Sequence, residues 1–367
     1  PTTNVALLPE AVLDSDIVEP ILNAARTANY VQPDENIFIR LGAYLYYMAE
    51  IAGKDKVTFV VPPELKSIFI WAEQLFEESL GKQGKGVTLF MEDELTQDML
   101  KPVATNDRVF LRINTQKTET RKEFVDSLKE QGYPVFDINV QDTLDLGGLQ
   151  MGLQDTVLTM GYLWNIVPID QDPVENYKKE TSKIMAELEP GERVTVPEAW
   201  GQGAARFGEN LTLYYQPILD AGRQRMEFLQ AVEQEDDNIP VPVQVERLIR
   251  YGFMTRAEYI QQYKQSILPQ LKKAVITEQD LEAEVARLGT TMDDAPAVYA
   301  AFHNIAARKG ALEVADLFSF GRMTTEFENV LQAARYGFSR QYQIPTKLAE
   351  GPDFLHSFFV NIADGPD

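Results

Sequence analysis

Helical and β-strand patterns alternate between residues 35 and 168, and this alternation limits the possible folds of the chain more than any other feature. Segments with helical spacing of apolar residues separate short runs that are rich in β-branched and aromatic residues. The helical segments are 35–52, 64–80, 118–131 and 149–164, and the strand segments are 57–61, 86–91, 108–114 and 134–140. Strands that alternate with helices pair in parallel, because each crossover connection places a helix over the sheet. We therefore predict an α/β fold, a three-layer αβα sandwich with a mostly parallel sheet.

The character of the sequence changes after residue 183, where strand patterns become rare and long charged helical stretches take over. A strand-like VYAAF returns at 298–302, a helix is predicted at 324–336, and FFVNI at 358–362 is predicted as a last strand. These changes predict three parts: an α/β domain over 1–183, a helical insertion over 184–294, and a segment over 295–367 that completes the α/β domain.

The charge of the chain restricts its partners. The 367 residues include 56 acidic and 34 basic ones, so the net charge is -22. Binding to nucleic acid needs a basic stripe that neutralises phosphates, and no dense Lys/Arg cluster is present. Anionic membranes are disfavoured for the same reason. We predict neither a nucleic-acid partner nor a membrane partner.

Cysteine and targeting signals bear on the compartment. The sequence has no cysteine, which excludes disulfides and thiolate nucleophiles. No apolar run approaches the roughly 20 residues that span a bilayer, and the first residues lack the basic and apolar regions of a secretory signal. The first residue is Pro rather than Met, which indicates that residues precede it. These features predict a cytoplasmic protein.

The most informative segment is the helix predicted over 64–80. On a helix that turns by about 100° per residue, its apolar residues form one continuous stripe. The stripe consists of Leu65, Ile68, Phe69, Ala72, Leu75, Phe76 and Leu80. Gln74 and Glu78 lie four residues apart on the opposite face, flanked by the large apolar Ile70 and Trp71. These neighbours allow a covered pocket for the polar pair, whereas the periodicity alone favours a pair of exposed helix-forming residues.

The sequence WAEQLFEESLGKQGKG, from Trp71 to Gly86, is similar to a signature of bacterial-type glucose-6-phosphate isomerases. In that family an amide and a carboxylate four residues apart precede a Ser-x-Gly-Lys turn. The resemblance implies that Glu78 is the base that carries a proton between C1 and C2 of the sugar, and that Gln74 binds substrate. A carboxylate suits proton abstraction next to a carbonyl, provided that it lies within hydrogen-bonding distance. Glu77 points about 100° away from Glu78 and serves as an internal control.

Two lysines follow in the turn after this helix. Lys82 and Lys85 would offset the acidic field near an anionic substrate, and the alternative is that both are solvated.

Other segments resemble the same family in the same order. They are LGAYLYYMAEIAGKDKVTFVVPPEL, GYPVFDINVQDTLDLGG and LWNIVPIDQDPVENYKKET. The sequence GPDFLHS resembles the family's Gly-Pro-x-x-Leu-His-Ser element, which implies that His356 assists opening of the sugar ring. Proton transfer suits the ordinary pKa of histidine, near 6.5, and the alternative for His356 is a structural role. His303, the other histidine, is predicted to be structural or hydrogen-bonded.

The resemblance covers residues 1 to about 185 and resumes at about 297, so it leaves the helical insertion without a family counterpart. After Ser357 the family continues with a Gly-Gln-Leu-His-Lys-Gly-Gly loop, whereas this chain passes directly to FFVNIAD. The family's Ser/Thr-rich phosphate cradle and terminal lysine also have no counterpart in these 367 residues. Either such segments lie outside this sequence or the chain is a remnant. A polypeptide of these residues alone is predicted to lack isomerase activity.

The resemblance implies an aldose-ketose isomerase of glycolysis and gluconeogenesis. The enzyme would interconvert glucose 6-phosphate and fructose 6-phosphate through a cis-enediol intermediate, on a sugar-isomerase (SIS-like) fold. It implies a small-molecule sugar phosphate as partner, no cofactor, and a homodimer. One alternative is a non-catalytic sugar-phosphate-binding or structural module that has lost the phosphate cradle. Another is an isomerase region fused to a transaldolase domain.

No metal site is predicted. Cysteine is absent and the two histidines, His303 and His356, lie far apart in the sequence. The acidic run at 233–237 lacks the spacing of an EF-hand and is predicted to be a solvated loop.

Overall fold

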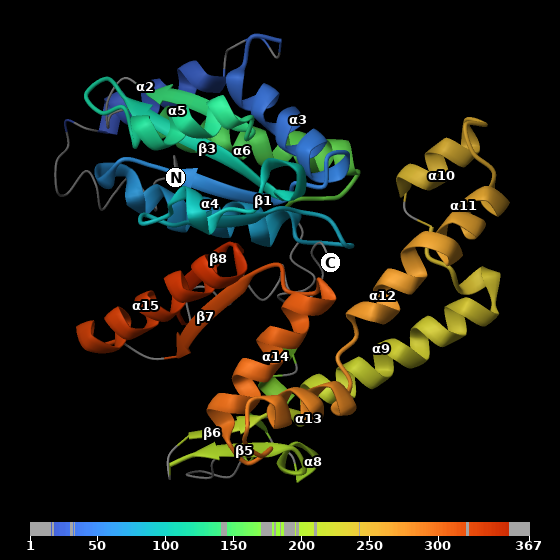
Figure 1. The fold of residues 1–367 in the computed structure, drawn as a ribbon. Coiled ribbons are helices and arrows are strands. Elements are labelled where there is room, and N and C mark those ends of the chain that lie inside the picture. The colour runs from blue at the N-terminus through green and yellow to red at the C-terminus, as the bar shows by residue number, and fades with distance from the viewer. Residues whose placement is uncertain are drawn as a thin grey trace. The chain divides into compact units, whose positions relative to one another are not determined.

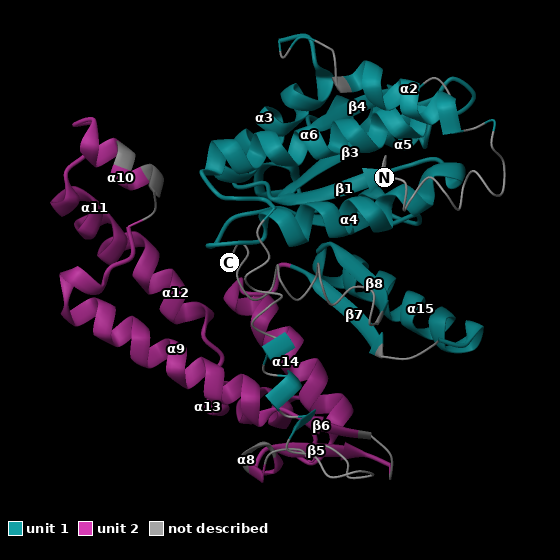
Figure 2. Ribbon diagram, turned by 180° about the vertical axis from the view of Figure 1, so that it is seen from behind, with its two compact units in different colours: residues 1–187, 314–367 teal, residues 188–313 magenta. Residues whose placement is uncertain are grey.

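The chain forms two compact units, Pro1–Glu187 with Val314–Asp367 and Leu188–Glu313, in the computed structural model (Figures 1 and 2). The structure describes residues 16, 18–29, 32, 34–140, 145–169, 178–179, 181–183, 185–186, 195, 198–208, 211–241, 243–320 and 323–351. Each unit has cores of its own, and each is described by itself below.

The first unit is built on a parallel sheet with the strand order β2-β1-β3-β4. The strands are β1 (Lys56–Val60), β2 (Thr88–Met91), β3 (Arg108–Thr115) and β4 (Val135–Val140). All three pairings are parallel, and Val57 of β1 lies level with Leu89 of β2 and with Val109 of β3. The four strands predicted between residues 57 and 140 are confirmed, and so is the α/β class with a parallel sheet.

Helices cover both faces of this sheet, as the alternation of side chains along each strand requires. Val57 and Phe59 of β1 point to one face, and Val60 points to the other. On the first face the core includes residues of α3 (Ile37–Glu50), α4 (Lys66–Leu80) and α6 (Leu146–Trp164). On the second face it includes residues of α5 (Lys122–Gln131) and α15 (Thr325–Tyr342). The predicted three-layer sandwich is therefore confirmed.

A close helix contact explains the glycines at the start of α6. Helix α2 (Val18–Asn29) packs against α6 at Gly147. A Cβ atom at Gly147 would lie 2.1 Å from the carbonyl oxygen of Ile21, which no side chain tolerates. A residue without a Cβ atom at position 147 is thus needed for the packing of α2 against α6.

Two further strands complete the first unit. Strands β7 (Ala315–Phe320) and β8 (Thr346–Gly351) form a parallel pair connected by α15. Strand β8 lies beside β2. The side chains of Glu92 and Lys347 contribute contacts between them. These short strands were not predicted from the sequence.

The second unit combines a β-hairpin with helices. Strands β5 (Ala204–Phe207) and β6 (Leu211–Tyr214) pair in antiparallel fashion. The helices are α8 (Glu198–Gly201), α9 (Gln216–Gln234), α10 (Val243–Arg250), α11 (Arg256–Gln262), α12 (Leu268–Ala274), α13 (Glu278–Arg287) and α14 (Ala295–Lys309). Helix α9 supplies Leu219 to one core of this unit and Leu229 to the other.

The strand predicted at 298–302 is wrong, because these residues belong to α14. Val298, Ala301, Phe302 and Ile305 are buried, and their spacing is that of one helix face. Gly310 ends the helix in the left-handed conformation. As α14 packs within the second unit, the boundary lies between residues 313 and 314 rather than between 294 and 295. The first boundary lies at 187/188, against the predicted 183/184.

The acidic run at 233–237 is exposed to solvent, as predicted, although it begins within the last turn of α9, and two of its carboxylates form ion pairs at the surface. Glu233 pairs with Lys272 at 2.5 Å, and Asp236 pairs with Lys264 at 2.5 Å. These pairs tie the end of α9 to the helical segment that follows it in the chain.

Candidate functional site

The predicted pair Gln74 and Glu78 lies on the outer face of α4. Gln74 is exposed and Glu78 is half-buried, and the Gln74 Nε2 atom donates a hydrogen bond to Glu78 Oε2 at 3.2 Å. The apolar stripe faces the core as predicted: Leu65, Ile68, Phe69, Ala72, Phe76 and Leu80 are buried, and Leu75 is half-buried. The amide and the carboxylate are therefore close enough to contact the same small molecule.

The turn of α4 that carries Glu78 lies level with the beginning of the neighbouring strand. Glu77 Oε1 accepts a hydrogen bond from the backbone N–H of Leu89, the second residue of β2, at 2.8 Å. Ligands of parallel α/β sheets usually bind at the carboxyl ends of the strands. The Gln74–Glu78 pair lies instead towards the amino ends, since α4 runs back along the sheet after β1.

A second pair of side chains on α4, Glu73 and Glu77, points inwards. Both are buried, and both contact the ammonium group of Lys347 on β8. The Nζ–Oε1 distance is 3.1 Å to Glu73 and 2.7 Å to Glu77. Glu77 thus points away from Glu78 as expected, but it is unsuitable as an inert control because its replacement disturbs a buried ion pair.

Burial sets the proton affinities in this cluster. It raises the pKa of Glu77, against the opposing effects of Lys347 and the Leu89 N–H. It also raises the pKa of Asp316, which lies opposite Lys347 in the register of β7 and β8. Burial opposes the charge of Lys347, but the carboxyls of Glu77, Glu73 and Asp316 outweigh it and raise the pKa of the ammonium group. A positively charged Lys347 therefore lies among three carboxyl groups.

The lysines in the turn after α4 are held by the protein. Lys82 is buried and its ammonium donates to the carbonyl oxygen of Val167 at 3.1 Å. Lys85 pairs with Glu50 of α3 at 3.3 Å, and Glu50 also accepts a hydrogen bond from the indole of Trp164 at 2.7 Å. The alternative of two solvated lysines is wrong, since both fix the turn to neighbouring elements.

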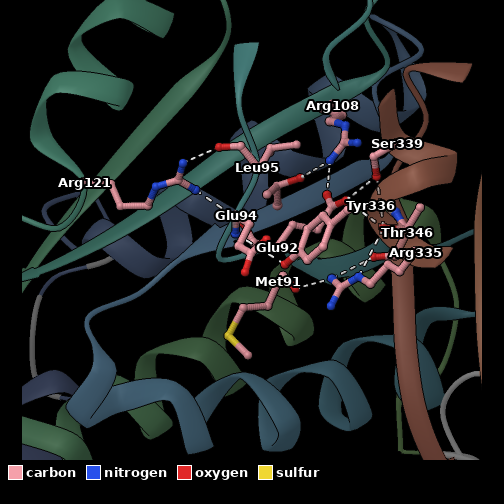
Figure 3. A network of polar contacts seen from close by, with 11 residues as sticks. Met91, Glu92, Glu94, Leu95, Arg108, Arg121, Arg335, Tyr336, Ser339 and Thr346 are labelled. Carbon is pink, nitrogen blue, oxygen red and sulfur yellow. Dashed lines mark hydrogen bonds and ion pairs between the residues drawn. The ribbon is translucent and has the colours of Figure 1, made fainter. Parts of the chain in front are cut away.

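A buried carboxylate, Glu92, joins the end of β2 to the carboxy-terminal part of the unit (Figure 3). One oxygen pairs with Arg108 of β3. The other accepts hydrogen bonds from Ser339 Oγ at 3.2 Å and from the N–H and hydroxyl of Thr346 at 3.2 and 3.0 Å. These contacts connect β2, β3, α15 and β8 around one side chain.

Arg335 of α15 adds a second connection at the same place (Figure 3). Its guanidinium donates to the carbonyl oxygens of Met91 and Thr346, and its Nε atom donates to Thr346 Oγ1 at 3.1 Å. Strand β8 is therefore attached to the edge of the sheet through side chains. The residues involved are far apart in the sequence, and nothing in their local pattern identified them.

Of the two histidines, only His303 lies among the residues that the structure describes. His303 lies on α14 of the second unit, where its Nδ1 atom is 2.8 Å from the carbonyl oxygen of Tyr299, in agreement with the hydrogen-bonded role predicted for it. His356 lies outside the described residues, so its role in ring opening stays a prediction. Within the described part of the chain, no three His, Cys, Asp or Glu side chains gather to hold a metal ion.

No helix among the described residues is long and apolar enough to cross a bilayer.

Comparison with known proteins shows a partial likeness to glucose-6-phosphate isomerases. No protein-family model matches the chain. The glucose-6-phosphate isomerase of Mycoplasmopsis pulmonis (strain UAB CTIP) is 28% identical over 223 residues, and the match covers 50% of this chain and 52% of that protein. The glucose-6-phosphate isomerase of Limosilactobacillus fermentum is 26% identical over 214 residues, and the match covers 48% of this chain and 48% of that protein. The match spans about half the length of these curated relatives.

Two solved structures show weaker likenesses. A hypothetical protein of Thermus thermophilus has a TM-score of 0.41 and 20% identity, covering 46% of this chain and 50% of that one. The C-terminal domain of glucosamine-fructose-6-phosphate aminotransferase from Francisella tularensis has a TM-score of 0.27 and 11% identity, covering 95% of each chain.

Proposed function

We propose that the protein is an aldose-ketose isomerase that interconverts glucose 6-phosphate and fructose 6-phosphate, with Glu78 as the base. The observation that carries the proposal is the outward-facing pair on α4, in which Gln74 donates to Glu78 at 3.2 Å. The partial similarity to two glucose-6-phosphate isomerases supports it.

The chemistry requires one base on one face of the substrate. The Glu78 carboxylate takes the proton from C2 of the open-chain aldose phosphate while O1 gains a proton, which gives a cis-enediol. The same group then delivers a proton to C1 while the hydroxyl on O2 loses its proton, which leaves the ketose. In the reverse direction the carboxylate takes a proton from C1 and delivers one to C2, and the proton that it holds exchanges in part with solvent while the cis-enediol is bound. The process is redox-neutral for the protein, because one hydrogen moves between C2 and C1, one proton moves between O2 and O1, and the double bond shifts within the sugar.

Gln74 and His356 take supporting roles in this proposal. The Gln74 amide orients the Glu78 carboxylate through its hydrogen bond, and its carbonyl oxygen is able to accept a hydrogen bond from a sugar hydroxyl. His356 transfers a proton to the ring oxygen as the sugar opens, a role that rests on the GPDFLHS resemblance.

The test is a coupled assay of glucose 6-phosphate formation from fructose 6-phosphate by the full-length protein. Glu78→Gln keeps the shape of the side chain and removes its basicity, so we expect kcat to fall by about 10²–10⁴-fold. Glu64→Gln is the matched control, since Glu64 is an exposed carboxylate just before α4, and it is expected to keep full activity. Glu78→Gln with wild-type kcat would exclude this base.

A binding measurement separates the enzyme from the non-catalytic alternative. Titration calorimetry with fructose 6-phosphate is expected to show binding by both the wild type and Glu78→Gln, with turnover by the wild type alone. Binding without turnover by the wild-type protein would favour a sugar-phosphate-binding module. Intact and native mass spectrometry of the same sample tests the predicted homodimer and the possible fusion to a transaldolase domain.

A further inference from the structure

Helix α4 carries two pairs of polar side chains with the same spacing, displaced by one residue. The outer pair is Gln74 and Glu78, and the inner pair is Glu73 and Glu77. A displacement of one residue turns a side chain by about 100° around the helix axis. Any contact that fixes the inner pair therefore fixes the direction in which the outer pair points.

One ammonium group holds both members of the inner pair. Lys347 Nζ lies 3.1 Å from Glu73 Oε1 and 2.7 Å from Glu77 Oε1, so it spans two successive turns of α4. The side chains of all three residues are almost fully buried, with exposed fractions of 4% for Lys347, 1% for Glu73 and 0% for Glu77. We call these three residues the Lys347 clamp.

The clamp is attached on two further sides. Glu77 Oε1 also accepts the Leu89 N–H of β2 at 2.8 Å, which prevents α4 from sliding along the strand. Lys347 lies on β8, with its ammonium 5.5 Å from the ring centre of Phe90 in β2. Helix α4, strand β2 and strand β8 thus meet at one buried charge.

The chemistry of the clamp is unusual for a contact that serves stability alone. Burying an ammonium and carboxylates removes them from water, and well-packed apolar side chains of similar volume often stabilise a core equally well or better. Ion pairs differ from apolar packing in direction: they tolerate little rotation or sliding of the elements that they join. This property is useful where a helix must present a functional face at a set angle.

The position of Lys347 in the chain links the clamp to a second predicted site residue. Residue 347 precedes His356 by nine positions, on the strand that leads directly into GPDFLHS. The clamp therefore ties the helix that bears Glu78 to the strand that precedes the second residue assigned to the reaction.

We propose that Lys347 is a positioning residue, which acts through Glu73 and Glu77 to hold the Gln74–Glu78 face of α4 in register with β8. The inference rests on the proposed isomerase function for its role in the reaction. The clamp itself rests on the contacts of Lys347 and is testable without any activity.

The decisive variant removes the charges of the clamp together. In Lys347→Met/Glu73→Gln/Glu77→Gln the charges of the clamp are removed together, and Asp316, the third carboxyl beside Lys347, is able to take up a proton because burial raises its pKa. We therefore expect the full-length protein to fold with a melting temperature close to that of the wild type. We expect kcat to fall by about tenfold to a hundredfold, because small misplacements of a catalytic group have effects of this size. KM is expected to stay within about twofold. A fall in kcat with an unchanged KM is a pattern that a purely structural role would not produce.

The control is Lys66→Met on the same helix, which breaks an exposed ion pair between Lys66 and Asp93 and is expected to leave kcat unchanged. A triple variant with wild-type kcat would overturn the positioning role. Should the triple variant fail to fold, Glu73→Gln retains the shorter Lys347–Glu77 contact and is expected to lower kcat by a smaller factor; wild-type kcat in that variant would equally overturn the role.

Hydrogen exchange separates a failure of this inference from a failure of the proposed function. If the wild-type protein shows no isomerase activity, the proposed function fails, and the clamp is judged by amide exchange along α4. We expect faster exchange at residues 74–78 in the triple variant and unchanged exchange in Lys66→Met. Identical exchange in the triple variant and the wild type would overturn the clamp.

Discussion

Buried carboxylates occur in both units, but their partners differ in exposure. In the first unit Glu92 and Glu77 pair with Arg108 and Lys347, whose side chains are only 1% and 4% exposed. In the second unit the buried Glu284 pairs with Arg287 and Arg308, whose side chains are 62% and 54% exposed.

The difference concerns hydration. Arg287 and Arg308 reach Glu284 from the surface and keep much of their contact with water, so the loss of one arginine leaves a side of the carboxylate that water can reach. The hydrogen bonds from Arg287, Arg308 and Asn304 lower the pKa of Glu284 to about 2. Arg108 and Lys347 have given up nearly all of their hydration, and water cannot replace them beside their carboxylate partners. The first unit therefore uses charges to fix geometry, whereas the second uses them at its periphery.

The largest effect is expected for Arg108→Leu. This change leaves Glu92 buried beside Ser339 and Thr346 without a cation, and breaking such a pair costs about 3–5 kcal/mol of unfolding free energy. Chemical unfolding followed by the fluorescence of Trp71 and Trp164, in a Trp200→Phe background, reports on the first unit. A loss below about 1 kcal/mol would show that the pair behaves as a surface pair, and the contrast between the two units would disappear.

A smaller, pH-dependent effect is expected for Asp316→Asn. The charged groups near Asp316 are Lys347, Glu73, Arg335 and Glu92, and burial makes the largest contribution to its raised pKa. A carboxyl with a raised pKa binds its proton more tightly in the folded state, so its contribution to stability is complete below its ordinary value of 3.8 and is lost as the pH rises through the raised value.

Asn imitates the protonated carboxyl and does not titrate. We therefore expect Asp316→Asn to gain stability relative to the wild type as the pH rises from about 4 to about 7, measured by thermal unfolding. Glu326→Gln, at an exposed position of α15, is the control and is expected to show a constant difference. A constant difference for Asp316→Asn as well would contradict the assigned direction.

The smallest effect is expected for Arg287→Leu in the second unit. Glu284 keeps its contacts with Arg308 at 2.8 Å and with Asn304 at 3.1 Å. The melting temperature of the second unit is expected to change by no more than the error of calorimetry. A loss as large as that of Arg108→Leu would show that exposure of the cation does not govern the outcome.

Local sequence patterns predicted the elements of the sheet well, because each strand and helix around it has a strong periodicity of its own. Strands β1, β2, β3 and β4 all fall where the runs of β-branched and aromatic residues indicated. The error at 298–302 arose because Val, Tyr and Phe favour strands, while the 298, 301, 302, 305 spacing of a helix face is visible only over a longer window. Strands β7 and β8 carry charged and small residues that weaken their signal.

Of the polar side chains on α4, only the outward-facing pair was predicted from the sequence. Gln74 and Glu78 were identified from their spacing and from a family resemblance, and the structure places them together. Glu73 and Glu77 lie at the margin of the apolar stripe, which is a detectable signal for inward-facing carboxylates. Their partner Lys347 is separated from Glu77 by 270 positions, and no local pattern connects residues so far apart.

The proton transfer assigned to Glu78 is tested most simply by following a solvent-derived proton. Fructose 6-phosphate is incubated with the full-length protein in D₂O, and deuterium at C2 of the glucose 6-phosphate formed is measured by mass spectrometry. Incorporation is expected with the wild type and with Glu64→Gln, at a rate at least about a hundredfold higher than with Glu78→Gln. Incorporation by Glu78→Gln at the wild-type rate would contradict the role of Glu78 as the base.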